Sequence, residues 1–144
     1  LPAALWLAAH RPPGAGRPAP IHQLPDDLFA EAIRRLGGTP DEVLAHPELL
    51  ELFLPVLRAD FALLETYDPP APGSGRAPLA CPLTVFGGED DEVASPAQLA
   101  HWRAGAGGPF RLKLYPGGHF FFSDHEAALL GEVLADLRAI EGGG

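Results

Sequence analysis

Two glycine-rich turns carry the residues best suited to chemistry in this sequence. Gly87-Gly88 opens an acidic run, Glu89-Asp90-Asp91-Glu92, and Gly117-Gly118 leads directly into His119. A carboxylate that accepts a hydrogen bond from the Nδ1–H of an imidazole fixes the tautomer of the ring and stabilises the imidazolium. This pairing is the acid–base half of a nucleophilic triad, so we predict that an aspartate of the first turn works together with His119.

Short apolar segments precede both turns and predict the elements that position them. Residues 83–86 and 110–115 have the composition of strands, and Ser95-Pro96-Ala97-Gln98 forms a capping box that opens a helix between them. In such a strand–helix–strand unit the strands are parallel, so their carboxyl ends lie at the same edge of the sheet. Catalytic residues collect at that edge. We therefore expect the acidic turn and His119 to be neighbours in space.

The identity of the carboxylate depends on position within the acidic run. The order of aspartate before histidine is that of α/β-hydrolases, whose triads run Ser, Asp, His along the chain. The spacing Gly87-x-x-Asp90-x-x-Val93 favours Asp90. We predict Asp90 as the partner of His119, with Asp91 as the alternative, and a solvated acidic loop for the rest of the run.

The remaining chain adds one strand, a group of helices and a last helix. The charge-free apolar run 3–9 predicts a strand buried on both faces, and residues 124–141 predict an amphipathic helix. Apolar residues between 25 and 67 follow a helical period, and Pro- and Gly-rich loops flank that segment. These patterns predict an α/β fold with a helical insertion at 25–67 and a strand–helix–strand–helix unit at 81–141.

Composition excludes several classes of function. The net charge of −9 disfavours nucleic acid and anionic membranes as partners. A single cysteine cannot form an internal disulfide, and the histidines lack the spacing of a metal-ligand set. No apolar run reaches the roughly 20 residues that span a bilayer. We expect a cytoplasmic protein with no metal site.

Several motifs carry a resemblance to a known family. They are His22-Gln23-Leu24-Pro25-Asp26, Arg35-Leu36-Gly37-Gly38-Thr39-Pro40, Leu54-Pro55-Val56-Leu57-Arg58-Ala59-Asp60-Phe61, Glu65-Thr66-Tyr67, Phe86-Gly87-Gly88-Glu89-Asp90 and Pro116-Gly117-Gly118-His119-Phe120-Phe121. In this order they resemble type II thioesterases, the stand-alone α/β-hydrolase thioesterases of polyketide and nonribosomal peptide assembly lines. The resemblance implies the C-terminal part of an α/β-hydrolase fold, with three parallel strands, flanking helices and an inserted helical lid at about 23–67.

The resemblance also implies the chemistry. Asp90 becomes the triad acid and His119 the general base of a serine hydrolase. That enzyme hydrolyses acyl thioesters on the phosphopantetheine arm of acyl or peptidyl carrier proteins, in editing or release during antibiotic biosynthesis, and needs no other cofactor. The candidates for the acyl pocket in the lid are Phe53, Leu57, Phe61 and Leu64, with plain core residues as the equal alternative. Arg34, Arg35 and Arg58 are candidates to meet an acidic carrier protein, with solvated surface side chains as the favoured alternative.

These 144 residues depart from the family at the nucleophile. Type II thioesterases carry it in a Gly-x-Ser-x-Gly elbow, which this sequence lacks; its serines are Ser74, Ser95 and Ser123. We expect the chain to be the C-terminal half of the enzyme and inactive alone, because a base without a nucleophile leaves the covalent step undone. The alternatives are another α/β-hydrolase esterase and a catalytically dead, carrier-binding fragment.

Other reactive residues have weaker claims to a role in the site. Cys81 stands before the 83–86 strand, at the end opposite the acidic turn, so we expect a buried structural cysteine. His10 follows the first strand and His22 lies at the entrance of the helical insertion. Both are candidates to line the cleft, with ordinary surface histidines as the alternative.

Overall fold

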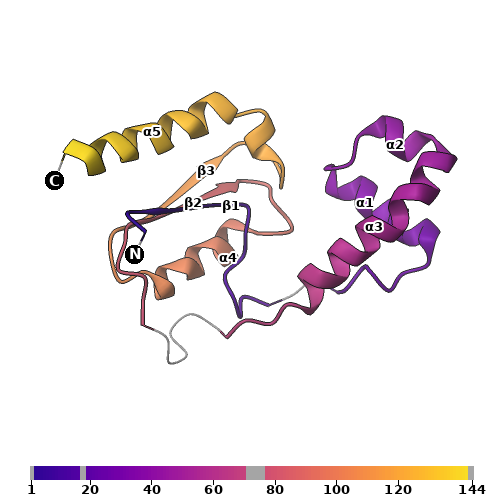
Figure 1. The fold of residues 1–144 in the computed structure, drawn as a ribbon, viewed down its shortest axis with the longest axis horizontal. Helices are drawn as coiled ribbons and strands as arrows, with labels where there is room; N and C mark the ends of the chain where they lie inside the picture. The colour runs from indigo at the N-terminus through magenta and orange to yellow at the C-terminus, as the bar shows by residue number, and fades with distance from the viewer. Residues whose placement is uncertain (1, 17–18, 71–76, 143–144) are drawn as a thin grey trace. The chain divides into compact units, whose positions relative to one another are not determined.

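The structure is a computed structural model, and it describes residues 2–16, 19–70 and 77–142. The chain divides into two compact units, one of residues 1–15 with 70–144 and one of residues 16–69 (Figure 1). The first unit is an α/β sheet and the second is helical.

The sheet consists of three parallel strands in the order β1-β2-β3. They are β1 (Leu5–Ala8), β2 (Leu83–Gly88) and β3 (Phe110–Tyr115). Leu5 lies opposite Leu83, and Gly88 lies opposite Tyr115, so the carboxyl ends of β2 and β3 are level. The predicted open, parallel sheet is confirmed, and its carboxyl edge carries both glycine-rich turns.

One face of the sheet is covered by α4 (Pro96–Ala100) and the 3-10 turn η1 (His101–Gly105). The buried residues on this face are Leu83, Val85, Ala94 and Leu99. The predicted capping box opens α4, because the Ser95 side chain accepts from the backbone N–H of Gln98 while the Gln98 side chain accepts from that of Ser95. This short helix begins where the turn that contains the acidic run ends.

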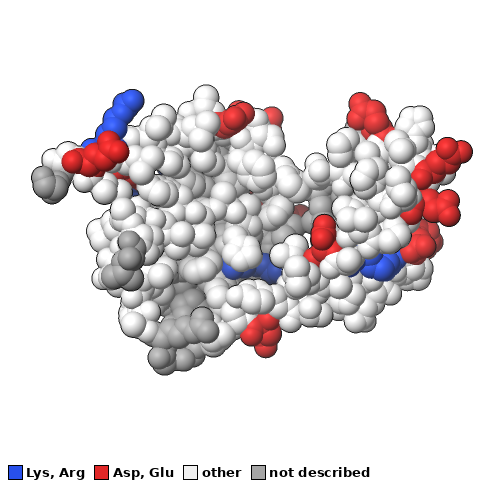
Figure 2. Space-filling view, viewed as in Figure 1, with Lys and Arg blue, Asp and Glu red and all other residues white. Residues whose placement is uncertain are grey.

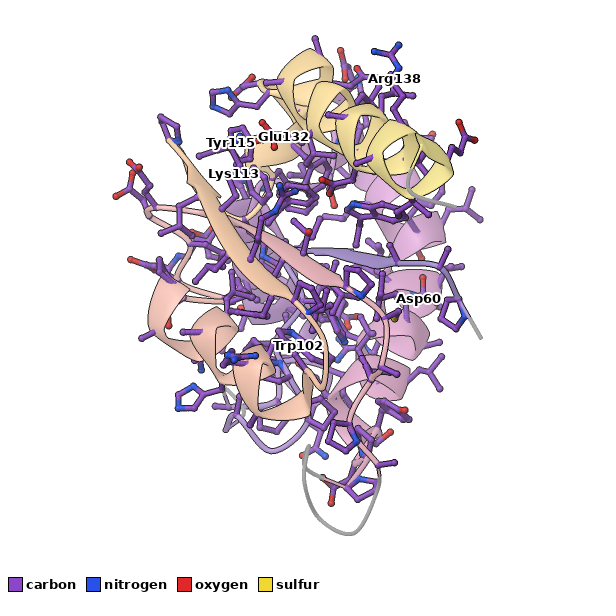
Figure 3. The ribbon with its side chains drawn as sticks, turned by 90° about the vertical axis from the view of Figure 1, so that its left-hand side faces the viewer. Asp60, Trp102, Lys113, Tyr115, Glu132 and Arg138 are labelled. Carbon is purple, nitrogen blue, oxygen red and sulfur yellow. The ribbon has the colours of Figure 1, made fainter. Side chains whose placement is uncertain are left out.

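The opposite face is covered by α5 (Glu126–Gly142), which follows the 3-10 turn η2 (Phe121–Ser123) (Figure 1). Its apolar contacts join Phe86, Tyr115 and Phe121 to Leu129 and Val133. Further along the helix the contacts are polar, and Figure 3 shows Lys113 and Glu132 side by side between β3 and α5. A second polar cluster is centred on Asp136, which accepts from Trp6 Nε1 and from Arg111.

The helical unit contains α1 (Asp26–Leu36), α2 (Asp41–Ala45) and α3 (Pro47–Thr66). Its buried core is formed by Phe29, Ile33 and Leu44. Helix α1 ends at Gly37, whose φ of 78° is in the left-handed region that favours glycine. Helix α3 continues through Pro55 without a break. None of the helices in the described residues is long and apolar enough to cross a membrane.

Charged side chains on the face shown in Figure 2 are mostly acidic, in line with the net charge of −9. The visible Lys and Arg residues form no broad basic patch on this face.

Candidate active site

The two glycine-rich turns meet at the carboxyl edge of the sheet. The backbone N–H of Glu89 donates to the carbonyl of Tyr115 at 2.8 Å, and that of Asp90 donates to the carbonyl of Gly117 at 3.0 Å. A Cβ added to Gly88 would lie 2.3 Å from the carbonyl oxygen of Gly118. The turns are therefore in backbone contact, as the parallel topology predicted, and only glycine permits this approach at position 88.

The imidazole of His119 pairs with Asp91. Its Nδ1 lies 3.0 Å from Oδ2 of a carboxylate that is only 2% exposed. The other oxygen of that carboxylate, Oδ1, accepts from the backbone N–H groups of Val93 at 2.8 Å and Ala94 at 2.9 Å. Two backbone donors thus hold the carboxylate with Oδ2 directed at the histidine.

The prediction that Asp90 meets His119 is wrong in the structure, and Asp91 takes that place. Asp90 is exposed, and only its backbone N–H participates in the contact between the turns. Neighbouring side chains in a turn point in different directions, so one of two adjacent carboxylates faces the interior. The signal that was missed is local: an aspartate readily accepts from backbone N–H groups two and three residues ahead, as Asp91 does.

The second ring nitrogen of His119 is available for chemistry. Since a carboxylate only accepts, the hydrogen bond requires a proton on Nδ1, so in the neutral ring Nε2 presents a lone pair. No described residue makes a hydrogen bond to Nε2, and the side chain is 25% exposed. An oriented imidazole with an open, unprotonated Nε2 has the arrangement of a general base.

The serines of the described residues stand elsewhere. Ser95 caps α4, and Ser123 ends η2 with its backbone N–H bonded to the carbonyl of Phe120. Neither makes a hydrogen bond to His119 within the part of the chain that the structure describes. Ser74 lies outside the described residues. Cys81 is half-buried and precedes β2, at the amino end of a strand whose carboxyl end carries the site.

His22 has a structural environment in the helical unit. Its Nδ1 contacts Glu65 near the end of α3, and the Glu65 carboxylate also accepts from the backbone N–H groups of Ile21 and His22. Burial raises the pKa of Glu65, but the hydrogen bonds from Ile21 and His22 outweigh it, so the net pKa lies below the ordinary value. Arg58 reinforces the same segment by donating to the carbonyls of His22 and Leu24.

The other candidate polar residues are likewise occupied in local contacts. Arg34 and Arg35 pair with Glu31 on their own helix, and Arg58 pairs with Asp26. His10 is exposed, and its carbonyl accepts from Trp102 Nε1 at 2.7 Å. No group of three or more His, Cys, Asp or Glu side chains suited to a metal ion occurs among the described residues.

The four apolar candidates on α3 divide into two pairs. Leu57 and Phe61 pack against the core of the helical unit, and the Phe61 ring contacts that of Phe29 edge-on with centroids 5.7 Å apart. Phe53 and Leu64 are 42% and 63% exposed. The exposed Phe120, which was not predicted from the sequence, contacts the His119 ring, and the exposed Phe122 contacts Phe120. The signal for both was their alternation with the buried Phe121.

A comparison with protein families decides the affiliation. The model of the thioesterase domain matches residues 1–139. The chain belongs to the thioesterase family. The thioesterase PikA5 of Streptomyces venezuelae is 36% identical over 141 residues, which cover 98% of this chain and 49% of PikA5.

Solved thioesterase structures agree with the fold. ClbQ from the colibactin nonribosomal peptide/polyketide pathway has 32% identity and a TM-score of 0.86, with coverage of 100% of this chain and 60% of ClbQ. The type II thioesterase BorB from the borrelidin biosynthetic cluster has 30% identity and a TM-score of 0.77, with coverage of 92% of this chain and 53% of BorB. The resemblance to type II thioesterases and the α/β-hydrolase fold are confirmed, and the chain spans about half the length of these relatives.

Proposed function

We propose that the protein hydrolyses acyl thioesters carried on the phosphopantetheine arm of acyl or peptidyl carrier proteins, in editing or release during polyketide or nonribosomal peptide biosynthesis. The observation that carries the proposal is the pair of His119 and Asp91 at the carboxyl edge of the sheet, with Nε2 open. Membership of the thioesterase family supplies the reaction class. A cytoplasmic location and independence of metals and other cofactors are part of the proposal.

His119 acts as the general base and Asp91 orients it. The Nε2 atom removes the proton of a serine hydroxyl while the serine oxygen bonds to the thioester carbonyl carbon. When the C–S bond breaks, the same proton passes from Nε2 to the leaving sulfur. Water then repeats the sequence: its proton goes to Nε2, its oxygen bonds to the acyl carbon, and the serine oxygen leaves with the proton.

The nucleophile of the proposal lies outside these 144 residues. No Gly-x-Ser-x-Gly motif occurs in the sequence, and neither Ser95 nor Ser123 is bonded to His119. We therefore expect the full-length protein to be the active species and this chain by itself to release no acyl group. The helical unit is the proposed lid, in which Phe53 and Leu64 keep exposed apolar side chains for an acyl chain.

The direct test measures hydrolysis of an acyl-carrier protein by the full-length protein and by its His119→Ala variant. General base catalysis contributes ~10²–10⁴-fold, so the variant is expected to lose about that factor. His101→Ala, which removes an exposed histidine of η1, is the control and should keep the wild-type rate. A His119→Ala rate within about tenfold of wild type contradicts the proposal.

A second experiment distinguishes carrier-bound thioesters from simple esters as substrates. The full-length protein is expected to hydrolyse an acyl group faster from a carrier protein than from a simple aryl ester of the same acid. Equal rates on both would favour a general esterase, because a carrier-directed enzyme gains binding energy from the carrier protein. Adding this chain alone to the acyl-carrier protein should release no free acid.

A further inference from the structure

A continuous series of aromatic contacts runs from His119 into the core. The ring of Phe120 lies perpendicular to the imidazole, with centroids 5.2 Å apart and an interplanar angle of 86°. Phe120 contacts Phe122 at 5.7 Å, and Phe122 contacts Phe121 at 5.6 Å. Phe121 stacks on Tyr115 of β3, with centroids 5.6 Å apart and planes inclined by 12°. The base is thus connected to the sheet through rings as well as through its own backbone.

The three phenylalanines have different positions because of the tight turn that contains them. The backbone N–H of Phe121 donates to the carbonyl of Gly118 at 3.1 Å, which directs its side chain inward between the sheet and α5. Phe121 is 2% exposed, whereas Phe120 and Phe122 are each 36% exposed. Phe121 therefore anchors the turn, and Phe122 contacts the ring of Phe120 edge-on.

The hydrogen bond to Asp91 does not by itself fix the imidazole. It keeps Nδ1 within hydrogen-bond distance of Oδ2, and within that limit the ring can still turn about the Cα–Cβ and Cβ–Cγ bonds. A general base works only when its lone pair points at the proton that it removes, so the plane of the ring must also be held. A perpendicular aromatic neighbour restricts that plane, since edge-to-face contact is a preferred geometry of ring pairs.

We propose that Phe120, supported by Phe122, is a positioning residue that sets the plane of the His119 imidazole and thereby the direction of Nε2. The assignment of His119 as a base rests on the proposed function, but the contact of the two rings does not. Phe120 acts through His119, so its ring needs no contact with the reacting atoms.

The first test uses NMR spectroscopy on the full-length protein labelled with 15N-histidine, at a pH where the imidazole is neutral. The His119 signals are assigned by their loss in His119→Gln. The readout is the three-bond coupling of Nδ1 to the two β-protons, which reports the torsion about Cβ–Cγ and therefore the plane of the ring; the tautomer itself is set by Asp91. We expect the wild type and Phe120→Tyr to show two unequal couplings, as a single ring orientation gives. Phe120→Leu keeps apolar volume but loses the ring, and its two couplings should move toward a common averaged value. Identical couplings in Phe120→Leu and wild type would overturn the proposal.

Signals of His125 serve as an internal check on folding. This histidine contacts the Tyr115 ring at a centroid distance of 5.4 Å, and its Nε2 lies 3.0 Å from the carbonyl of Pro116. If the turn stays folded in Phe120→Leu, the His125 signals remain as in wild type. If they change, Phe120→Tyr is the decisive variant: His119 couplings that differ from wild type although position 120 keeps its ring contradict the proposal.

The second test is kinetic and separates positioning from substrate contact. In the full-length protein, Phe120→Leu is expected to lower kcat by about 10- to 100-fold with KM nearly unchanged, because misdirecting a catalytic group affects the chemical step. Phe120→Tyr should recover most of the wild-type kcat. A higher KM with unchanged kcat would overturn the positioning role in favour of substrate contact. If the wild type hydrolyses no thioester, the proposed function fails while the NMR experiment still tests Phe120.

Discussion

Oδ2 of Asp91 lies 3.0 Å from Nδ1 of His119, across 28 positions of sequence. Between the two residues lie α4, η1 and β3, which return the chain to the same edge of the sheet. Asp91 is fixed by hydrogen bonds within its own turn, and His119 is held by the turn that follows β3. The pair therefore depends on the contact between the two turns as much as on the two side chains.

Replacing Asp91 is expected to impair catalysis far more than replacing Asp90. In Asp91→Asn an NH₂ group, which donates, replaces one of the two acceptor oxygens, so the preferred tautomer of His119 is lost and kcat falls by up to ~10⁴-fold. Asp90→Asn changes an exposed carboxylate next to it and should leave kcat near wild type. Steady-state hydrolysis of an acyl-carrier protein by both full-length variants measures the difference. Equal losses in the two variants would contradict the assignment of Asp91.

The sheet could be predicted because its sequence signals are local. Gly87 and Gly88 are the last two residues of β2, and Pro116-Gly117-Gly118 directly follows β3. Ser95 supplies the capping box of α4. These signals gave the strands, their parallel order and the shared edge. The helical unit was also visible as a run of helical periodicity between breaker-rich loops.

The choice between Asp90 and Asp91 could not be predicted in the same way. Both are aspartates in one acidic run, and the backbone angles of a single turn decide which carboxylate faces inward. The side chains on α3 pose a similar problem. Phe53, Leu57, Phe61 and Leu64 all fit one helical stripe, yet only Leu57 and Phe61 pack on the core of the helical unit. Such details depend on tertiary packing, which periodicity alone does not contain.

Gly88→Ala is expected to separate the two turns of the site. The added Cβ would lie 2.3 Å from the carbonyl oxygen of Gly118 and 2.4 Å from that of Gly117, and backbone atoms cannot rotate away as a side chain can. We expect loss of thioester hydrolysis together with a lower melting temperature. Gly131→Ala in α5 is the control, because nothing lies within 4 Å of its added Cβ. Alanine at that helical position should stabilise the protein by roughly 0.5–1 kcal/mol. Wild-type activity in Gly88→Ala would contradict the described contact.

The helical unit should lose stability in acid, because protonation of Glu65 removes the contribution of its carboxylate. Its pKa lies below the ordinary value of 4.5 in the folded state, so its carboxylate stabilises the fold above the unfolded pKa and the contribution is lost as the pH falls through the folded pKa. The difference in unfolding free energy between wild type and Glu65→Gln is therefore expected to be largest above pH 4.5, to decline as the pH falls further and to vanish below the folded pKa. Urea unfolding followed by circular dichroism at several pH values measures this difference.

Glu31 is the matched control for that experiment. Hydrogen bonds from Arg34 and Arg35 also lower its pKa, but the carboxylate is on the surface of α1, where water screens ion pairs. Glu31→Gln should change the unfolding free energy much less than Glu65→Gln at neutral pH. A larger effect at Glu31 would show that Glu65 does not tie residues 21 and 22 to α3.

Asp136 is expected to hold α5 on the sheet. It accepts from Trp6 Nε1 of β1 at 3.0 Å and from Nη2 of Arg111 in β3 at 2.7 Å, so one carboxylate connects the helix to both outer strands. Asp136→Ala leaves the part-buried indole N–H without its acceptor and should lower the unfolding free energy by about 1–3 kcal/mol. Glu141→Ala, at an exposed position near the end of the same helix, should stay within about 0.5 kcal/mol of wild type. Urea unfolding measures both variants, and an unchanged midpoint in Asp136→Ala would mean that the apolar contacts of Leu129 and Val133 suffice to dock α5.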